Sequence, residues 1–522
     1  MHPKSEKTFY VTTPIYYVND VPHIGHAYTT VAADILARYK RLEGGYRVFF
    51  LTGTDEHGQK VEKAAQERGV DPKVHCDEMV KRFQSLWQRL EISNNDFIRT
   101  TEARHRTVVQ KILQDLYDRG EIYLDSYEGW YCVPCERFWT EKDLTDGKCP
   151  DCLRPVIEIS EKNYFFRMSK YQSWLIKHIE GNDRFILPPA RRNEILGFLR
   201  APLGDLCISR PKKRLRWGIE IPFDTDYVTY VWFDALINYV SGIGFGENPD
   251  FDQFWPEAIH LIGKDILTTH TVYWPTMLKA AGLMPPKTVF AHGWWTIEGK
   301  KMSKSLQNVV EPNRLIDTYG SDAVRYFLMR EVPFGIDGDF SHSAMVHRIN
   351  SDLANDLGNL FSRTLTMVVR YFDGVVPAPS LPQEIDRGLQ GVSERVFSQL
   401  PRQMEDLAFN KALATIWEMV SACNKYVDET SPWSLAKEMK DRPRLGTVLY
   451  HALESLRLTA LLLAAFMPSA SEKMWLQLRM EENLWEQNLK ENGKWGGLRP
   501  GNRVAKPTPL FPRVDPAKIS FE

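Results

Sequence analysis

The sequence has no long hydrophobic run, so a protein built around membrane-spanning helices is excluded. The longest apolar stretch, Leu458 to Met467, has about half of the roughly 20 residues that a spanning helix needs. We expect it to be a buried helix. The polar segment 1–7 is too short for a signal or transit peptide, so we expect neither a leader nor a membrane partner.

Charge of one sign is also missing, because 66 basic and 67 acidic residues leave a formal net charge of −1. The chain therefore has no overall basic character of the kind that holds a protein to nucleic acid. Any contact with nucleic acid must use a local patch, for which the basic run 210–216 is a candidate. A solvated loop is the simpler interpretation of that run.

Cysteine is scarce, with seven residues in 522. An odd number without a secretory signal argues against a disulfide framework and predicts a reducing, cytoplasmic location. Cys76, Cys207 and Cys423 are scattered and are expected to be small core residues. The other four form one cluster.

The composition is that of an ordinary globular protein, with 43% apolar, 12% aromatic and 25% charged residues. The length predicts roughly three or four domains. Near the start, an apolar strand at 8–13 precedes Pro14, which we expect to end it. A helical pattern follows at 25–42, then a strand at 47–52 and a helix from about residue 59. This alternation predicts an α/β fold with a doubly wound parallel sheet.

The alternation breaks after about residue 120 and resumes near 228. Expected elements there are a strand at 260–263, a helix at 269–281 and a strand at 288–292. From about residue 342 the chain reads as nearly all helix, without repeats or low-complexity tracts. The predicted parts are a first half-domain at 1–120, an insertion at 121–227, a second half-domain at 228–341, and a helical domain with a tail at 342–522.

Two histidines stand at the junction of the first strand and helix, in His23-Ile-Gly-His26. The start of a helix exposes backbone N–H groups and a positive dipole end, which suit phosphate. The histidines add donors, and Gly25 allows an adenine ring to approach the backbone. Two loop histidines without any role are the alternative, and four residues alone do not decide between them.

A second basic signal, Lys301-Met-Ser-Lys-Ser305, follows the last strand of the second half. Lys301 and Lys304 would bring mobile positive charge to a phosphate, and charge neutralisation and positioning dominate chemistry at phosphorus. A solvated basic loop is the alternative. It is disfavoured because both signals occur in the right order at the ends of the right strands.

The four clustered cysteines form two C-x2-C pairs separated by thirteen residues. Four thiolates suit one tetrahedral Zn²⁺ ion, and a closed four-sulfur site is structural. A redox-active C-x-x-C is the alternative, although two paired motifs favour metal. The predicted ligands are Cys132, Cys135, Cys149 and Cys152.

The two basic motifs together resemble the signatures of class I aminoacyl-tRNA synthetases. In detail the chain is similar to the methionine–tRNA ligases of the bacterial type with one four-cysteine knuckle, from Thr8 to about Trp475. The resemblance implies that His23, His26, Lys301 and Lys304 are catalytic. It also places these four with Gly25, Asp265 and Gly293 around ATP and its Mg²⁺.

The resemblance also implies a methionine pocket, in which Asp55 holds the ammonium group. An apolar, aromatic site would suit the flexible and polarizable thioether. Leu236 stands where some relatives have proline. The pocket residues implied are Ile15, Tyr17, Asp55, Trp232, Ala235, Leu236, Tyr239, Ile266 and His270.

Asn355, Asn359 and Arg363 are spaced four apart and fall on one helical stripe. Leu353, Leu357, Leu360 and Phe361 form the opposite, apolar face. Spacing alone favours an ordinary solvated face. The resemblance instead makes the stripe an anticodon reader, together with Trp433, which could stack on an unstacked base.

The implied reaction attaches L-methionine to tRNA(Met), including the initiator, through a methionyl-adenylate, with release of pyrophosphate and AMP. Because the sequence ends soon after the helical domain, a monomer is expected. The rivals are a synthetase for another apolar amino acid or cysteine, a small-molecule nucleotidylyltransferase, and a zinc-ribbon nucleic-acid binder. A short insertion of about 110 residues and the lack of cysteine near the first motif favour methionine.

Overall fold

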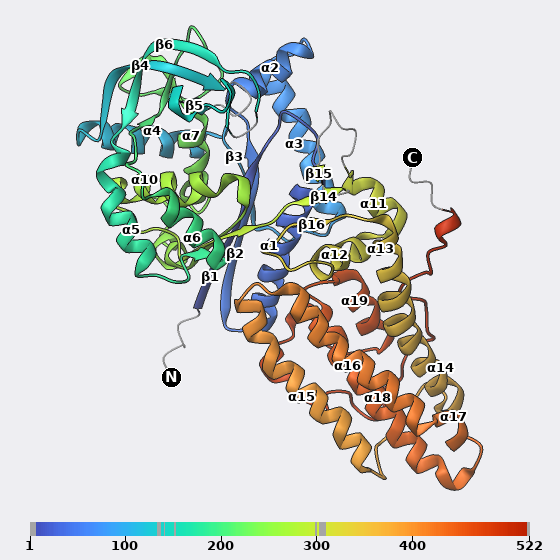
Figure 1. The fold of residues 1–522 in the computed structure, drawn as a ribbon. Coiled ribbons are helices and arrows are strands. Elements are labelled where there is room, and N and C mark those ends of the chain that lie inside the picture. Colours follow the sequence, from blue (N-terminus) through green and yellow to red (C-terminus); the bar gives the residue numbers. More distant parts are fainter. Residues whose placement is uncertain are drawn as a thin grey trace.

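The computed structural model describes residues 7–132, 137–139, 141–150, 153–297, 300–301 and 310–518. An α/β part and a helical part lie at opposite ends of an elongated molecule (Figure 1). Within those ranges, no helix is both long and apolar enough to cross a membrane.

A six-stranded parallel sheet forms the centre of the α/β part, which confirms the predicted fold class. Strand β1 lies in the middle, with β2 and β3 on one side and β12 and β13 on the other. The chain therefore builds the sheet in one direction from β1 and in the opposite direction from β12, so the strand order switches between these two strands. Parallel sheets bind ligands above the carboxyl ends of the strands at such a switch point. The order is β3 (Asp96–Arg99), β2 (Tyr46–Asp55), β1 (Lys7–Tyr17), β12 (Ala258–Gly263), β13 (Thr288–His292) and β7 (Ile186–Leu187).

Strand β1 continues past Pro14, so the prediction that this proline ends the strand is wrong. Thr12 pairs with Leu51, and pairing resumes between Ile15 and Gly53 after a shift in register. A bulge of this kind leaves the proline, which has no N–H, outside the ladder. The extension pairs Tyr17 with Asp55 of β2, past the residues of β1 that pair with β12.

Helix α1 (Ile24–Glu43) confirms the predicted first helix and ends at Gly44, which has a φ of 80°. After β2 come α2 (Gln59–Glu67) and α3 (Pro72–Arg89), and α4 (Ala103–Asp118) follows β3.

The helix expected at 269–281 differs from the prediction at its start. Thr269–Tyr273 is π-helical and only α10 (Trp274–Ala281) is α-helical. Single π turns are frequent at functional sites.

The segment predicted as an insertion is built on the antiparallel pair β4 (Ile122–Cys132) and β6 (Ile157–Phe166). Two helices follow, α5 (Gln172–Glu180) and α6 (Pro189–Phe198), and β7 between them joins the edge of the central sheet. Shorter strands flank these elements: β5 (Arg137–Trp139), β8 (Leu206–Cys207), β9 (Ser209–Pro211), β10 (Glu220–Ile221) and β11 (Asp224–Thr229).

A long helical rod leads from the α/β part into the helical part. It consists of α13 (His342–Arg348), a π-helical segment (Ile349–Asn359) and α14 (Leu360–Phe372). The four residues predicted to form its apolar face are all fully buried. The remaining long helices are α15 (Glu384–Glu405), α16 (Phe409–Thr430), α18 (Arg442–Leu463) and α19 (Pro468–Gln477). The stretch 458–467, predicted to be a buried helix, is buried throughout, and α18 ends within it at Leu463.

One buried ion pair joins the two parts. Arg325 lies in α12 (Ser321–Arg330) and contacts Asp34 of α1 at 2.7 Å, with both side chains fully buried. The same guanidinium donates to the carbonyl oxygens of Ala465 and Phe466, which follow α18, and of Leu90. All three nitrogens of the guanidinium donate, so Arg325 links α1 to the chain that follows α18.

Candidate active site

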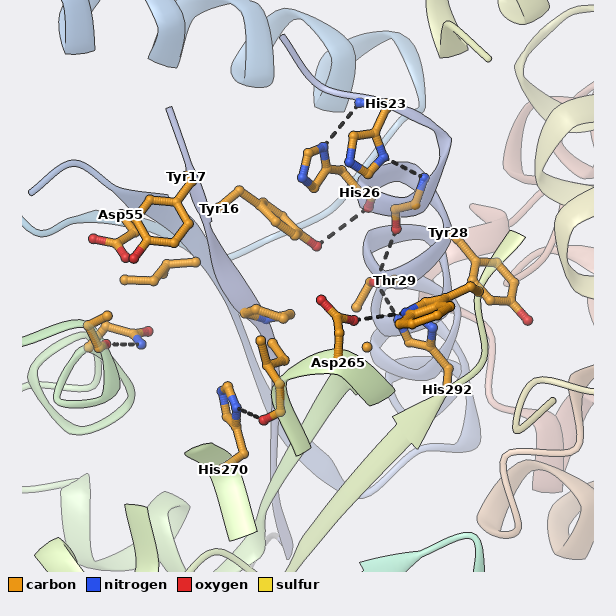
Figure 2. A pocket seen from close by; sticks show the side chains of 18 of the residues that line it. Tyr16, Tyr17, His23, His26, Tyr28, Thr29, Asp55, Asp265, His270 and His292 are labelled. Atoms are coloured by element: carbon orange, nitrogen blue, oxygen red, sulfur yellow. Dashed lines mark hydrogen bonds between the residues drawn. The ribbon is translucent and has the colours of Figure 1, made fainter. Parts of the chain in front are cut away.

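A cavity of about 460 Å³ opens at the carboxyl ends of β1, β2, β12 and β13. It lies where the switch point of the sheet predicts a ligand. Figure 2 shows Asp55 and Tyr17 on one side, His23 and His26 on another, and Asp265 near His292. All the predicted methionine and ATP residues outside 301–304 line this one cavity: Ile15, Tyr17, His23, Gly25, His26, Asp55, Trp232, Ala235, Leu236, Tyr239, Gly293, Asp265, Ile266 and His270.

The two histidines form a reciprocal cap at the start of α1. The His23 ring accepts from the Gly25 N–H at 3.1 Å, and the His26 ring accepts from the His23 N–H at 3.0 Å. Their rings stack with centroids 3.8 Å apart. Both bonds use Nδ1, so in the neutral rings Nε2 carries the proton. The neutral His26 ring therefore presents an N–H group at Nε2.

His26 is neutral in the free protein. Burial, followed by the proximity of His23, holds the pKa of His26 well below its usual value. The positive end of the site is therefore supplied by the helix N-terminus and by hydrogen-bond donors, with no imidazolium at this position.

The far end of the cavity is aromatic. Tyr17 and Trp232 meet edge to face at 6.5 Å, and Trp232 meets His270 in the same way at 6.4 Å. The carboxylate of Asp55, at the end of β2, lies on the same side of the cavity as Tyr17. An acidic group beside an uncharged aromatic wall suits a ligand with one cationic and one apolar end.

Tyr239 and His270 form a neutral pair in this wall. The two side chains are joined at 2.7 Å, between the Tyr239 hydroxyl and Nε2 of His270, and Nδ1 of His270 lies 2.9 Å from the Ile266 carbonyl. Since that carbonyl only accepts, Nδ1 carries the proton and the tyrosine donates to Nε2. Burial lowers the pKa of His270 to about 4. The pair therefore places no charge against an apolar side chain.

The third side of the cavity is formed by Asp265 and Gly293, which follow β12 and β13. A side chain at Gly293 would place its Cβ 2.1 Å from the Ile336 carbonyl, so only glycine fits. Asp265 accepts from the indole N–H of Trp294 at 3.0 Å. The carboxylate is thereby held toward the cavity.

Sequence reasoning missed several residues of the cavity. Thr29 of α1 meets Nε2 of His292 at 2.6 Å, which links the first half of the sheet to the second directly beneath the site. Lys60 lies over the Tyr17 ring at 4.8 Å. For His292 and Trp294, the only signal in the sequence was a position at or just after the end of a predicted strand. Such a position does not distinguish a residue that lines a cavity from a core residue.

The second basic motif lies only partly in the described chain. Lys301 belongs to β15 (Lys300–Lys301), which pairs with β14 (Trp295–Ile297). Residues 302–309, including Lys304, lie outside the described residues. The chain is described again at Val310, whose carbonyl accepts from the N–H of Ile24 at 3.3 Å. The segment after the motif is therefore attached beside His23, at the start of α1.

Two of the four clustered cysteines can be placed. Cys132 ends β4, and the Cys149 carbonyl accepts from the Leu153 N–H at 2.8 Å. Both are fully buried. Cys135 and Cys152 lie outside the described residues, and no group of three metal-ligating side chains is found in the rest of the chain that the structure covers.

The predicted anticodon residues lie far from the cavity, in the helical part. Asn355 and Asn359 are exposed on the π-helical segment, while Arg363 is half-buried. Arg363 donates to Asn424 at 2.9 Å and to Asp428 at 3.1 Å, both in α16. Trp433 follows that helix in α17 (Pro432–Leu435) and is 43% exposed.

A parallel sheet with a cavity at the start of the first helix, followed by a helical domain, is the architecture of a class I aminoacyl-tRNA synthetase. The sequence matches the family described as tRNA synthetases class I (M) at residues 9–158 and 154–365. It matches the anticodon binding domain of methionyl tRNA ligase at residues 376–520.

Individual relatives are methionine–tRNA ligases. The methionine–tRNA ligase of Caldanaerobacter subterraneus subsp. tengcongensis is 53% identical over 98% of this chain and 80% of the relative. That of Bacillus subtilis is 47% identical over 98% and 79%. Mycobacterium tuberculosis methionyl-tRNA synthetase in complex with methionyl-adenylate superposes with a TM-score of 0.93, at 42% identity, covering 97% of this chain and 100% of that structure. The chain therefore belongs to the methionine–tRNA ligase family.

Proposed function

We propose that this cavity holds L-methionine and ATP side by side, so that methionyl-adenylate forms in it before transfer to tRNA(Met). Activation of methionine and charging of tRNA are the activity of the family, and a related structure contains methionyl-adenylate. One observation carries the placement: an acidic, aromatic end and a phosphate-binding helix start lie in a single cavity.

Methionine fits the aromatic end. Asp55 takes the ammonium group, and Tyr17, Trp232 and the neutral pair of Tyr239 and His270 surround the side chain. An uncharged wall accommodates a thioether without leaving a buried charge unpaired, whereas a lysine or glutamate side chain would bring one. The methionine carboxylate then points toward the middle of the cavity.

ATP fits the remaining space. The start of α1 and the Nε2–H groups of His23 and His26 donate to phosphate oxygens. Asp265 accepts from the ribose, and the nucleoside lies along the cavity wall that contains Gly293. Mg²⁺ accompanies the nucleotide and neutralises charge on its phosphates.

Adenylate formation needs no general base, because the attacking carboxylate carries no proton. The methionine carboxylate attacks the α-phosphorus in line, and pyrophosphate leaves with the bond's electron pair. A terminal ribose hydroxyl of tRNA then attacks the adenylate carbonyl, and AMP leaves. We assign to Lys301 and Lys304 of the second basic motif the stabilisation of charge that develops on the departing phosphates.

Amino-acid-dependent exchange of pyrophosphate into ATP tests this proposal. We expect exchange with methionine and none above background with valine, isoleucine, leucine or cysteine at the same concentration. Exchange without any amino acid would indicate a nucleotidylyltransferase. No exchange at all, from folded protein with both substrates present, would overturn the assignment.

We further propose that Cys132, Cys135, Cys149 and Cys152 hold one structural Zn²⁺ ion. Burial of the two described cysteines supports a closed thiolate site. Metal analysis of protein purified without chelators should give one zinc per chain, and Cys149→Ala should abolish it. Zinc-free protein with a normal circular dichroism spectrum and normal activity would refute the site.

The helical part is proposed to read the anticodon with Asn355, Asn359, Arg363 and Trp433. Exposure of the asparagines and of the tryptophan supports this, because unpaired bases stack on exposed aromatic rings. Arg363 would exchange its contacts with Asn424 and Asp428 for a base edge. A monomer stays a prediction, which light scattering measures directly.

A further inference from the structure

Behind the aromatic wall lies a chain of three buried hydrogen bonds. Asp234 accepts from Nδ1 of His57 at 2.7 Å through one carboxylate oxygen. Its other oxygen meets Nε2 of His105 at 2.7 Å. Nδ1 of His105 in turn meets the Ser241 hydroxyl at 2.7 Å. All four residues are buried, and none of them lines the cavity.

The members of this chain come from elements that carry the cavity walls. His57 stands two residues after Asp55, in the loop between β2 and α2. Asp234 belongs to α7 (Val231–Leu236), which also carries Trp232. The carboxylate thus connects the first half of the sheet with the second at the level of the amino-acid site.

The last residue of this hydrogen-bonded network lies on the second helix that carries an aromatic residue of the wall. Ser241 ends α8 (Asn238–Ser241), which carries Tyr239. His105 lies in α4, outside both walls, and bridges α7 and α8. One set of side chains therefore fixes α7 and α8 to each other and to the loop after Asp55.

Glu56, which lies between Asp55 and His57 in the sequence, is held by hydrogen bonds of its own. Its carboxylate accepts from Arg99 at 2.6 Å and 2.9 Å and from the Thr101 hydroxyl at 2.6 Å. The loop after β2 is therefore attached on one side to the β3 region and on the other, through His57, to α7. Loss of the His57 bond would release only the second attachment.

The hydrogen bonds of this network are shielded from solvent. The Trp217 ring meets the His57 ring edge to face at 5.5 Å, and its indole N–H donates to the Glu56 carbonyl. Burial alone would raise the pKa of Asp234, but the imidazoles of His57 and His105 outweigh it and hold that pKa below its usual value. In so dry a setting a hydrogen bond to a carboxylate is strong and directional.

We propose that His57, Asp234 and His105 form a clamp that sets the position of Trp232 and Tyr239 relative to Asp55, and thereby determines the affinity for the amino acid. These are positioning residues, because none touches the ligand. The inference rests on the proposed placement of methionine in the cavity. The ammonium group and the side chain of methionine are contacted by the two elements that the clamp joins. Loosening the clamp therefore weakens both sets of contacts at once.

A purely structural network would behave differently. It would lower the stability of the protein, and KM values for both substrates would stay equal to those of the wild type. A positioning role raises KM for methionine while KM for ATP is unchanged, because the nucleotide is held by the start of α1 and by Asp265 and Gly293.

His57→Leu is the decisive variant, measured by pyrophosphate exchange beside the wild type. We expect KM for methionine to rise roughly tenfold and KM for ATP to stay within about twofold. His57→Asn keeps an amide N–H near the position of Nδ1 and should restore most of the affinity. His451→Leu is the matched control, since His451 is buried in α18 and its ring bonds only to its own helix, at the Thr447 carbonyl.

Ser241→Ala carries the same test if His57→Leu does not fold, with an expected rise of about threefold in KM for methionine. An unchanged KM for methionine in the folded variant overturns the clamp, as does a parallel rise for ATP or an equal effect in His451→Leu. If the wild type itself shows no methionine-dependent exchange, the proposed function fails first. Normal wild-type exchange with an unaffected variant removes the clamp alone.

Discussion

At the residue scale, backbone N–H groups decide how the two histidines of the site can act. Nδ1 of both rings is occupied as an acceptor, so both remaining protons are on Nε2. With the pKa of His26 far below its usual value, that ring is a neutral donor at physiological pH. In the proposed mechanism, His26 contributes a directed hydrogen bond to the transition state, which strengthens as charge builds on a phosphate oxygen.

His26→Ala should therefore slow methionine-dependent pyrophosphate exchange by roughly 10²- to 10³-fold in kcat, with KM for methionine unchanged. His26→Gln keeps an N–H near the position of Nε2 and should lose much less. Steady-state exchange kinetics measure both. Equal loss in the two variants would show that the donor is irrelevant, and a change confined to KM for methionine would place His26 at the wrong substrate.

At the element scale, a carboxylate from one helix caps the start of another. Asp322 of α12 accepts from the backbone N–H of Ala470 in the first turn of α19, while its other oxygen is buried without a partner. Burial, reinforced by nearby Glu91, raises the pKa of Asp322 from 3.8 to about 7. The folded protein therefore binds a proton that the unfolded chain releases.

The sign of the pH dependence follows from that raised pKa. Stability contributed by protonated Asp322 is complete below about pH 4 and is lost as the pH rises toward 7. Asp322→Asn cannot ionise, so its melting temperature should exceed that of the wild type by a few degrees at pH 8 and by less at pH 5. Thermal denaturation at both pH values tests this, and an advantage that shrinks with rising pH would contradict it.

A second buried carboxylate organises the chain after α20 (Leu489–Asn492). Glu454 of α18 accepts from the N–H groups of Gly496 and Gly497 at 2.8 and 2.9 Å, and from Leu498 at 2.9 Å. It also pairs with Arg457 at 2.7 Å, and both side chains are almost fully buried. Glycine is required at 497, where a Cβ would lie 2.5 Å from the guanidinium.

Glu454→Gln should destabilise the protein by roughly 3–5 kcal/mol, because an amide N–H₂ then faces backbone donors and Arg457 keeps an unpaired charge. Urea denaturation followed by tryptophan fluorescence measures the loss. Glu481→Gln is the control, since its ion pair with Arg499 is exposed and should contribute nothing measurable. Similar midpoints for the two variants would refute the role of Glu454.

The elements themselves were largely predictable, and the exceptions have physical reasons. Alternating apolar strands and amphipathic helices defined the parallel sheet, and the apolar face of the rod at 353–361 followed from its periodicity. Pro14 misled the prediction because a bulge can pass a residue without an N–H, and the sequence does not mark bulges. The π turns at Thr269–Tyr273 depend on tertiary packing and leave no pattern of their own.

At the scale of the whole molecule, the site is assembled from segments hundreds of residues apart. Parallel strands bring their carboxyl ends to one edge, which explains why Asp55, Asp265 and Gly293, predicted from the family resemblance, line one cavity. The clamp at Asp234 could not, because buried histidines and aspartates carry no spacing that identifies their partners. The same holds for Arg325 and Asp34, which fix the helical part to the sheet.

In this arrangement the proposed anticodon residues lie far from the cavity. Trp433 lies in α17, at the opposite end of the molecule from the insertion sheet of β4 and β6, and the cavity lies in the α/β part (Figure 1). A substitution at Trp433 should therefore leave the geometry of the cavity intact. Stacking on one base is worth about 1–3 kcal/mol, so losing it weakens tRNA binding about ten- to hundredfold.

Trp433→Ala should thus raise KM for tRNA(Met) by roughly ten- to hundredfold while pyrophosphate exchange stays at the wild-type rate. Aminoacylation and exchange are measured on the same preparation. Met439→Ala is the matched control, because Met439 is 80% exposed in the same region and has no predicted role. Equal loss of both activities in Trp433→Ala would mean that the tryptophan supports the fold, and unchanged charging would remove it from the tRNA interface.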